Sequence, residues 1–206
     1  MSPKDSELEI EIKFYLPDPA RMRQRIVDLG ATSRGRCFEH NVRFDNANHE
    51  LRNRSTLLRL RRDRDTTLTY KARPADRDDR FKVYRELEVA IDDFDKTRKI
   101  LHALGFNREQ IYDKWREVFT LEDLQFCMDD LPFGSFLEIE GHPPDIVKYA
   151  DRLDLDWHKR ILTNYLAMYE SVKRYLNLPY SDVTFDNFQN SADLPPDFMQ
   201  QFEAGA

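Results

Sequence analysis

The sequence has few cysteines and few glycines, and it contains no long apolar segment. The two cysteines, Cys37 and Cys127, are too few for a disulfide framework and show no metal-ligand spacing, so we expect reduced thiols in a cytoplasmic protein. No segment approaches the ~18 apolar residues of a transmembrane helix, and the N-terminus lacks the apolar core of a secretory signal. We therefore expect neither membrane contact nor export.

Motifs that mark several large enzyme classes are also missing. The chain has no glycine-rich phosphate loop and no nucleophile elbow, and its five histidines share no ligand spacing. The net charge of −6, from 32 basic and 38 acidic residues, disfavours binding to nucleic acid. Any anion site must therefore be a local concentration of arginine and lysine.

What the sequence does contain is a strand with one fully charged face, at residues 8–14 (LEIEIKF). Successive side chains of a strand point to opposite faces, so Glu9, Glu11 and Lys13 share one face and apolar side chains share the other. The simplest interpretation is an open antiparallel sheet with its charged face in water. A barrel that closes on itself would instead turn this face into a polar interior.

The same alternation recurs in four later segments, at 57–62, 85–89, 113–119 and 136–141. Turn signals and the remaining extended segments bring the total to about eight antiparallel strands, with helices inserted between them. Apolar periodicity predicts these helices at 19–29, 92–106, 145–155 and 163–176. We therefore expect one α+β domain over residues 1–178, followed by an extended tail at 179–206 that is partly disordered or packed on the domain or a partner.

The charged faces of these strands offer two sets of side chains. The acids are Glu9, Glu11, Glu86, Glu88, Asp129 (or its neighbour Asp130), Glu138 and Glu140, and the bases are Lys13, Arg59, Arg61, Lys71, Lys114 and Arg116. Burying so many unpaired charges would be too costly, so the set fits a wet interior that holds ions. Carboxylates without histidine or cysteine favour Mg²⁺ or Mn²⁺, and arginine with lysine suits an extended phosphate chain. Together they indicate phosphoryl chemistry.

An ordered series of short motifs runs through these strands. They are EIEIK at 9–13, LRLR at 58–61, YK at 70–71, ELE at 86–88, KWR at 114–116, MDDL at 128–131 and LEIEG at 137–141. The series resembles the CYTH domain, or triphosphate tunnel metalloenzymes, a family that includes class IV adenylate cyclases, thiamine triphosphatases and inorganic triphosphatases. The resemblance covers about residues 7 to 170.

The resemblance implies an eight-stranded antiparallel closed barrel, open at both ends, with helices packed outside and a triphosphate along its axis. It implies catalytic roles for Glu9, Glu11, Lys13 and Lys114. The implied ligands of Mg or Mn are Glu9, Glu11, Asp129, Glu138 and Glu140. The implied substrate-binding residues are Lys13, Arg59, Arg61, Lys71, Lys114, Arg116, Glu86 and Glu88, of which the two glutamates orient basic groups or assist a metal.

Three functions remain open at this point. The preferred one is metal-dependent hydrolysis of tripolyphosphate or of an organic triphosphate such as ATP or thiamine triphosphate. The alternatives are a class IV adenylate cyclase and a non-catalytic module that binds polyphosphate or nucleotide.

A homodimer through an outer sheet face is compatible with the sequence. Other basic residues, including Arg64, Arg73 and Lys82, are expected at loops and rims.

Overall fold

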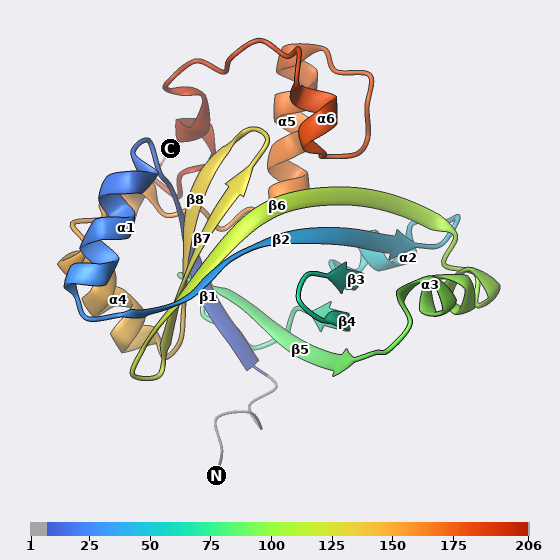
Figure 1. Cartoon of the computed structure of the whole chain (residues 1–206), viewed down its shortest axis with the longest axis horizontal. Helices are drawn as coiled ribbons and strands as arrows, with labels where there is room; N and C mark the ends of the chain where they lie inside the picture. The colour runs from blue at the N-terminus through green and yellow to red at the C-terminus, as the bar shows by residue number, and fades with distance from the viewer. Residues whose placement is uncertain (1–7, 206) are drawn as a thin grey trace.

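In the computed structural model of the chain, which describes residues 8–205, eight antiparallel strands close into a barrel (Figure 1). The strands are β1 (Leu8–Tyr15), β2 (Thr32–Asp45), β3 (Leu57–Arg62), β4 (Thr66–Ala72), β5 (Lys82–Ala90), β6 (Arg108–Leu121), β7 (Leu124–Leu131) and β8 (Gly134–Glu140). Their order around the barrel is β1-β5-β4-β3-β2-β6-β7-β8, and β1 pairs with both β5 and β8. The closed α+β barrel predicted from the sequence is therefore confirmed.

Helices cover the outside of the barrel. They are α1 (Pro19–Asp28), α2 (Glu50–Asn53), α3 (Phe94–Ala103), α4 (Pro143–Arg152), α5 (Tyr165–Leu176) and α6 (Phe185–Phe188), with 3₁₀ turns at Trp157–Lys159 and Phe198–Phe202. Four of them begin at a side-chain cap, since Asp18, Asp93, Asn164 and Thr184 accept hydrogen bonds from backbone N–H groups of α1, α3, α5 and α6. None of the helices in the described residues is long and apolar enough to cross a membrane.

Most outward apolar side chains of the strands pack beneath these helices in three clusters, whereas Tyr70, Leu87 and Val89 on β4 and β5 stay exposed. Helices α1 and α4 cover β1, β7 and β8, where Ile12, Ile26 and Ile139 are fully buried. Helix α3 lies over β2 and β3, and α5 lies over β6 and β8. The apolar face of every predicted charged strand is thus directed outward, which leaves the charged face to the barrel interior.

The segment after α5 crosses the outside of the barrel. Val183 is fully buried and forms a parallel bridge with Tyr112 of β6, and Met199 is buried beside α5. Glu203 then bridges to Ile161, which also pairs with Lys13. The segment therefore fastens α5 to the end of the barrel where β1 finishes.

Candidate active site

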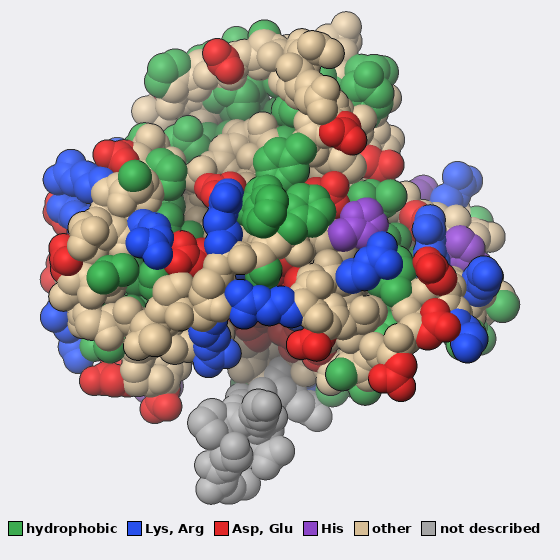
Figure 2. Space-filling model, in the orientation of Figure 1, with side chains coloured by type: hydrophobic (Ala, Val, Ile, Leu, Met, Phe, Trp, Pro, Cys, Tyr) green, Lys and Arg blue, Asp and Glu red, His purple; other side chains and the backbone are tan. Residues whose placement is uncertain are grey.

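The eight strands enclose a cavity of about 800 Å³, here called the tunnel. Its walls carry most of the charged residues singled out from the sequence, namely Glu9, Glu11, Arg59, Arg61, Lys71, Glu86, Glu88, Lys114, Arg116, Glu138 and Glu140. Lys13 and Asp129 are fully buried in the wall. On the face shown in Figure 2, acidic and basic side chains gather at a hollow below the centre of the molecule. The alternating strands have therefore placed their charges inside a shared cavity rather than on an open surface.

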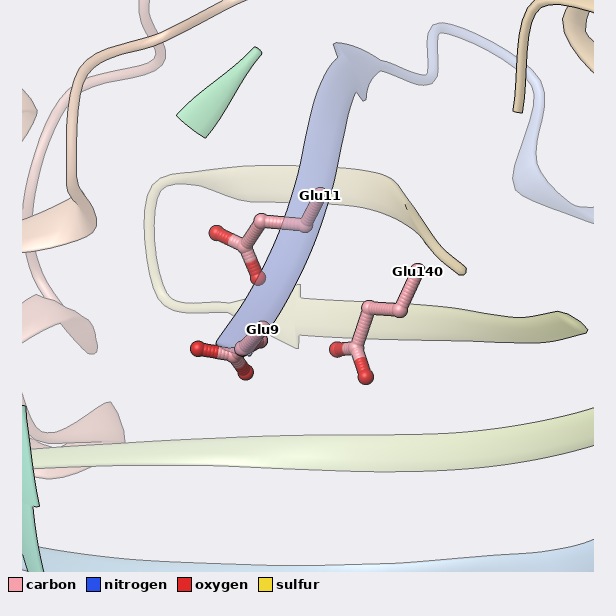
Figure 3. Close-up of side chains that lie close together, drawn as sticks. All are labelled: Glu9, Glu11 and Glu140. Atoms are coloured by element: carbon pink, nitrogen blue, oxygen red, sulfur yellow. The ribbon is translucent and has the colours of Figure 1, made fainter. Parts of the chain in front are cut away.

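Three carboxylates from two neighbouring strands form an acidic cluster. One oxygen from each of Glu9, Glu11 and Glu140 lies within 4.8 Å of the others (Figure 3). The cluster forms because β1 and β8 pair with Glu11 directly opposite Glu140. Lys71 and Lys82 pair with Glu9 and Glu11, respectively.

Glu140 is the least compensated member of the acidic cluster. Its contact with a cationic side chain is weak, with 4.0 Å between a carboxylate oxygen and Nη1 of Arg116. Burial and the nearby charge of Glu9 raise the pKa of Glu140 to about 8. A bound cation would relieve this repulsion, and an all-carboxylate donor set suits Mg²⁺ or Mn²⁺. The residues present therefore fit the metal that the sequence implies.

Asp129 lies in a different environment from the acidic cluster. Its carboxylate accepts hydrogen bonds from Nζ of Lys114 at 2.9 Å, from Nε of Arg116 at 2.6 Å and from the hydroxyl of Tyr165 at 2.9 Å. Its neighbour Asp130 points away from the tunnel and pairs with the exposed Arg36 at 2.7 Å. The sequence left open which of these two aspartates faces inward, and the structure shows that it is Asp129.

Glu138 is likewise paired with cations. It contacts Nζ of Lys13 at 3.2 Å and forms a hydrogen bond with Arg116. Burial opposes its ionisation, but Lys13 and Arg116 outweigh burial and hold the pKa of Glu138 well below its usual range. The structure thus brings Glu9, Glu11 and Glu140 together and leaves Asp129 and Glu138 outside this cluster, where a metal-binding role stays a prediction.

The predicted phosphate-binding cations are held by carboxylates as well. Lys71 lies 2.8 Å from Glu86, and Glu88 contacts Arg61 at 3.5 Å and Arg59 at 3.8 Å. Such contacts restrict the rotamers of long basic side chains and aim their heads into the tunnel. They support the orienting role that the resemblance implies for the two glutamates.

Lys13 is fully buried at one end of the cation set. Its ammonium lies 3.6 Å from the ring centroid of Tyr165, on α5. Burial and the like charge of Lys82 lower the pKa of Lys13 to about 8 despite the attraction of Glu138. Tyr165, which also holds Asp129, was not assigned a role from the sequence, because nothing in the strand pattern shows that α5 reaches the tunnel.

Glu39 of β2 is a functional candidate that sequence reasoning missed. It is 2% exposed, and its carboxylate lies 3.4 Å from Lys114, 3.8 Å from Arg116 and 4.0 Å from Arg61. Burial opposes its ionisation, but Lys114 and Arg116 prevail and lower the pKa of Glu39 to about 2. The available signal was its position in an extended segment, but its partner Lys114 is brought opposite only by the β2–β6 register.

Lys82 corrects another expectation. The sequence suggested a charge at a loop or rim, but Lys82 begins β5, lines the tunnel and forms an ion pair with Glu11. Lys82 therefore joins the interior cations.

The sequence of the tunnel strands matches the family model of the CYTH domain over residues 7–162. The chain belongs to the CYTH family. A Methanocaldococcus jannaschii protein named as a candidate adenylate cyclase is 31% identical over 141 residues, which cover 68% of this chain and 79% of that protein. The CYTH match ends before α5, so Tyr165 enters the site from outside the matched region.

Solved structures with this fold include two proteins described as candidate cyclases. One, from Vibrio parahaemolyticus, has a TM-score of 0.71 and 18% identity, covering 79% of this chain and 98% of that chain. The other, from Hippeastrum, is described as having a dominant triphosphatase activity, with a TM-score of 0.56 and 20% identity over 80% of this chain and 96% of that one. The names of these similar proteins thus refer to adenylate cyclase and triphosphatase activities.

Proposed function

We propose that the protein is a metal-dependent triphosphatase that hydrolyses tripolyphosphate or an organic triphosphate inside the tunnel. The observation that carries this proposal is the acidic cluster of Glu9, Glu11 and Glu140 facing a cavity whose remaining wall carries arginine and lysine. A pure anion-binding module would not need a carboxylate cluster that repels its own ligand.

Glu9, Glu11 and Glu140 would hold the Mg²⁺ or Mn²⁺ ion, with Asp129 and Glu138 assigned by resemblance as further ligands. When bound, the ion supplies neutralisation of phosphate oxygens and of the leaving group. Its binding also requires Glu140 to lose its proton, since the pKa of this carboxyl is raised.

The cations of the tunnel bind and orient the phosphate chain. Arg59, Arg61 and Arg116 offer planar forks that bind two phosphate oxygens each, and Lys71 and Lys114 offer compact charges. Since Glu86, Glu88 and Asp129 already fix these side chains, little reorganisation accompanies charge development on the phosphoryl group. A water oxygen attacks the terminal phosphorus, the bond to the bridging oxygen breaks, and the shorter phosphate chain leaves. The proton of the water passes to solvent or to phosphate oxygen.

Cyclisation of ATP is the second candidate. It is supported by the Methanocaldococcus jannaschii relative at 31% identity, which is named as a candidate adenylate cyclase. In this reaction the ribose 3′-hydroxyl of ATP attacks the α-phosphorus and pyrophosphate leaves. The same cations would bind the triphosphate, so the nucleophile separates the two reactions.

Product analysis distinguishes these candidates. The protein is incubated with Mg²⁺ or Mn²⁺ and, separately, with tripolyphosphate, ATP and thiamine triphosphate. Release of orthophosphate is expected, whereas cyclic AMP with pyrophosphate would support the cyclase. Binding without any product would contradict both enzymatic functions and favour the binding module.

A further inference from the structure

At one end of the tunnel, the lining continues past the predicted phosphate-binding residues to three more arginines. Arg43 lies near the end of β2, Arg52 lies on α2, and Arg73 directly follows β4. Arg43 is directly opposite Arg59 in the β2–β3 register, so it extends the row of cations inside the barrel, whereas Arg52 and Arg73 are exposed. We call Arg43, Arg52 and Arg73 the mouth arginines.

Arg43 differs from the interior cations in what surrounds it. It lines the tunnel and is partly buried, yet within residues 8–205 it has neither a hydrogen bond nor an ion pair through its side chain. By contrast, the interior cations Arg59, Lys71 and Arg116 each contact a carboxylate. A partly buried guanidinium without an anion costs free energy, which an anionic ligand would recover.

The surroundings of Arg43 leave its positive charge poorly compensated. Burial lowers the pKa of its guanidinium, and the like charge of Arg52 lowers it further, although Asp45 opposes both effects. Asp45 forms no ion pair with Arg43. Its carboxylate instead accepts hydrogen bonds from the backbone N–H groups of Leu51 at 3.0 Å and Arg52 at 3.1 Å. Glu170 of α5 also lines the tunnel but forms no ion pair within the described part of the chain.

Local contacts hold two of the mouth arginines, Arg52 and Arg73. The two hydrogen bonds to Asp45 fix the start of α2 and hence the position of Arg52. The guanidinium of Arg73 lies 5.8 Å from the ring centroid of Tyr84, a tunnel residue of β5. Arg52 and Arg73 are solvent-exposed, so only the backbone of Arg52 and the ring contact of Arg73 are fixed in this way.

We propose that the mouth arginines form a further phosphate subsite, which binds the units of a linear inorganic polyphosphate beyond the third phosphate. The inference rests on the proposed function, because it assumes that the first three phosphates lie on the interior cations. A fourth phosphate next to the one on Arg59 would meet Arg43 directly, with Arg52 and Arg73 beyond it. A neutral nucleoside in this position would leave the guanidinium groups unpaired.

Binding without turnover tests the subsite. Calorimetry in the presence of a chelator compares tripolyphosphate, linear tetraphosphate and orthophosphate on the full chain and on Arg43→Gln and Arg52→Gln. We expect tetraphosphate to bind the unaltered protein about tenfold more tightly than tripolyphosphate, the effect of one added charge-assisted contact. Either substitution should remove this preference and leave tripolyphosphate affinity unchanged.

Arg62→Gln is the matched control. Arg62 lies on the adjacent strand β3, but its guanidinium packs on the ring of Phe94 outside the barrel at 4.6 Å, so the chain-length preference should persist in this variant. Equal affinity for tripolyphosphate and tetraphosphate would overturn the inference. Equal weakening of the binding of both ligands by Arg43→Gln would overturn it as well. Suppression of the tetraphosphate preference by orthophosphate at equal concentration would also overturn it, because the subsite would then bind free phosphate rather than a chain.

Hydrolysis assays separate this inference from the proposed function. If tripolyphosphate is not hydrolysed with Mg²⁺ or Mn²⁺ but the chain-length preference is present, the proposed function is wrong and the subsite stands. If hydrolysis occurs and the preference is absent, the subsite is wrong. Arg52 is exposed, so Arg52→Gln keeps the test valid even if Arg43→Gln lowers stability.

Discussion

Two groups of carboxylates share the tunnel, and they differ in what neutralises them. In the acidic cluster, Glu140 lies near Glu9 and Glu11 and its pKa is raised to about 8. In the second group, Asp129 and Glu138 lie between cations, and the pKa of Glu138 is held well below its usual range. Glu138 and Glu140 are two residues apart on β8 and face the same cavity.

The comparison shows that neighbours, not residue type or burial, decide what a tunnel carboxylate can do. Asp129 has its oxygens occupied by donors from Lys114, Arg116 and Tyr165. Glu140 has a weak cationic contact and repels its neighbours, so it is the group that gains most from a divalent ion. The first arrangement stabilises the positions of cations, whereas the second is suited to bind one.

The largest effect should come from removing the least compensated carboxylate. We expect Glu140→Gln to lower metal-dependent hydrolysis by at least about a hundredfold, because loss of an outer-shell partner alone costs 10–100-fold. Below pH 8 the metal-free variant should be about as stable as the parent, since the amide is neutral like the protonated carboxyl that it replaces. The measurement is steady-state kinetics with thermal unfolding, and Glu170→Gln is the control. Unchanged activity in Glu140→Gln would remove the acidic cluster from the reaction.

A second variant tests the group of Asp129 and Glu138, which cations neutralise. Arg116→Met removes partners of Asp129 and Glu138, so we expect it to lower the free energy of unfolding by about 3 kcal/mol, the cost of breaking a buried ion pair. The matched control is Arg36→Met, which breaks the exposed pair with Asp130 and should cost about 1 kcal/mol or less. Urea unfolding measures both, and equal losses would contradict the distinction between the two aspartates.

Glu39→Gln sharpens the comparison by changing one charge beneath the cations. Lys114 and Arg116 lose an orienting partner, so we expect kcat to fall about tenfold. They also lose a compensating negative charge, so we expect KM to stay level or decrease. Glu39→Asp should recover part of kcat because it restores the charge. A rise in KM together with a lower Tm would instead indicate a purely structural role.

The smallest effect concerns pH. Between the ordinary glutamate pKa of about 4.3 and the raised value of about 8, the folded protein holds a proton on Glu140 that the unfolded chain has lost. Stability of the metal-free protein should therefore decrease as pH rises through this range. Affinity for Mn²⁺ should increase over the same range and level off above pH 8. Titrations at several pH values measure both trends, and Glu140→Gln should flatten them.

The sequence predicted the barrel and most of its inward charges because alternation in a strand fixes which side chains share a face. It could not choose between Asp129 and Asp130, because that choice depends on the register that places Asp129 opposite Arg116. It missed Glu39, whose partner Lys114 lies far along the chain and is brought opposite only by the β2–β6 pairing. It gave Tyr165 no role, since a helical pattern does not reveal which strand end the helix meets.

Crystallography with Mn²⁺ and tripolyphosphate tests the central claim most directly. Anomalous scattering locates the ion without reference to any catalytic assay. The account predicts a peak coordinated by carboxylate oxygens of Glu9, Glu11 and Glu140, with phosphate oxygens on the facing arginines and lysines. A peak held by Asp129 and Glu138 alone, or a tripolyphosphate bound outside the tunnel, would contradict it.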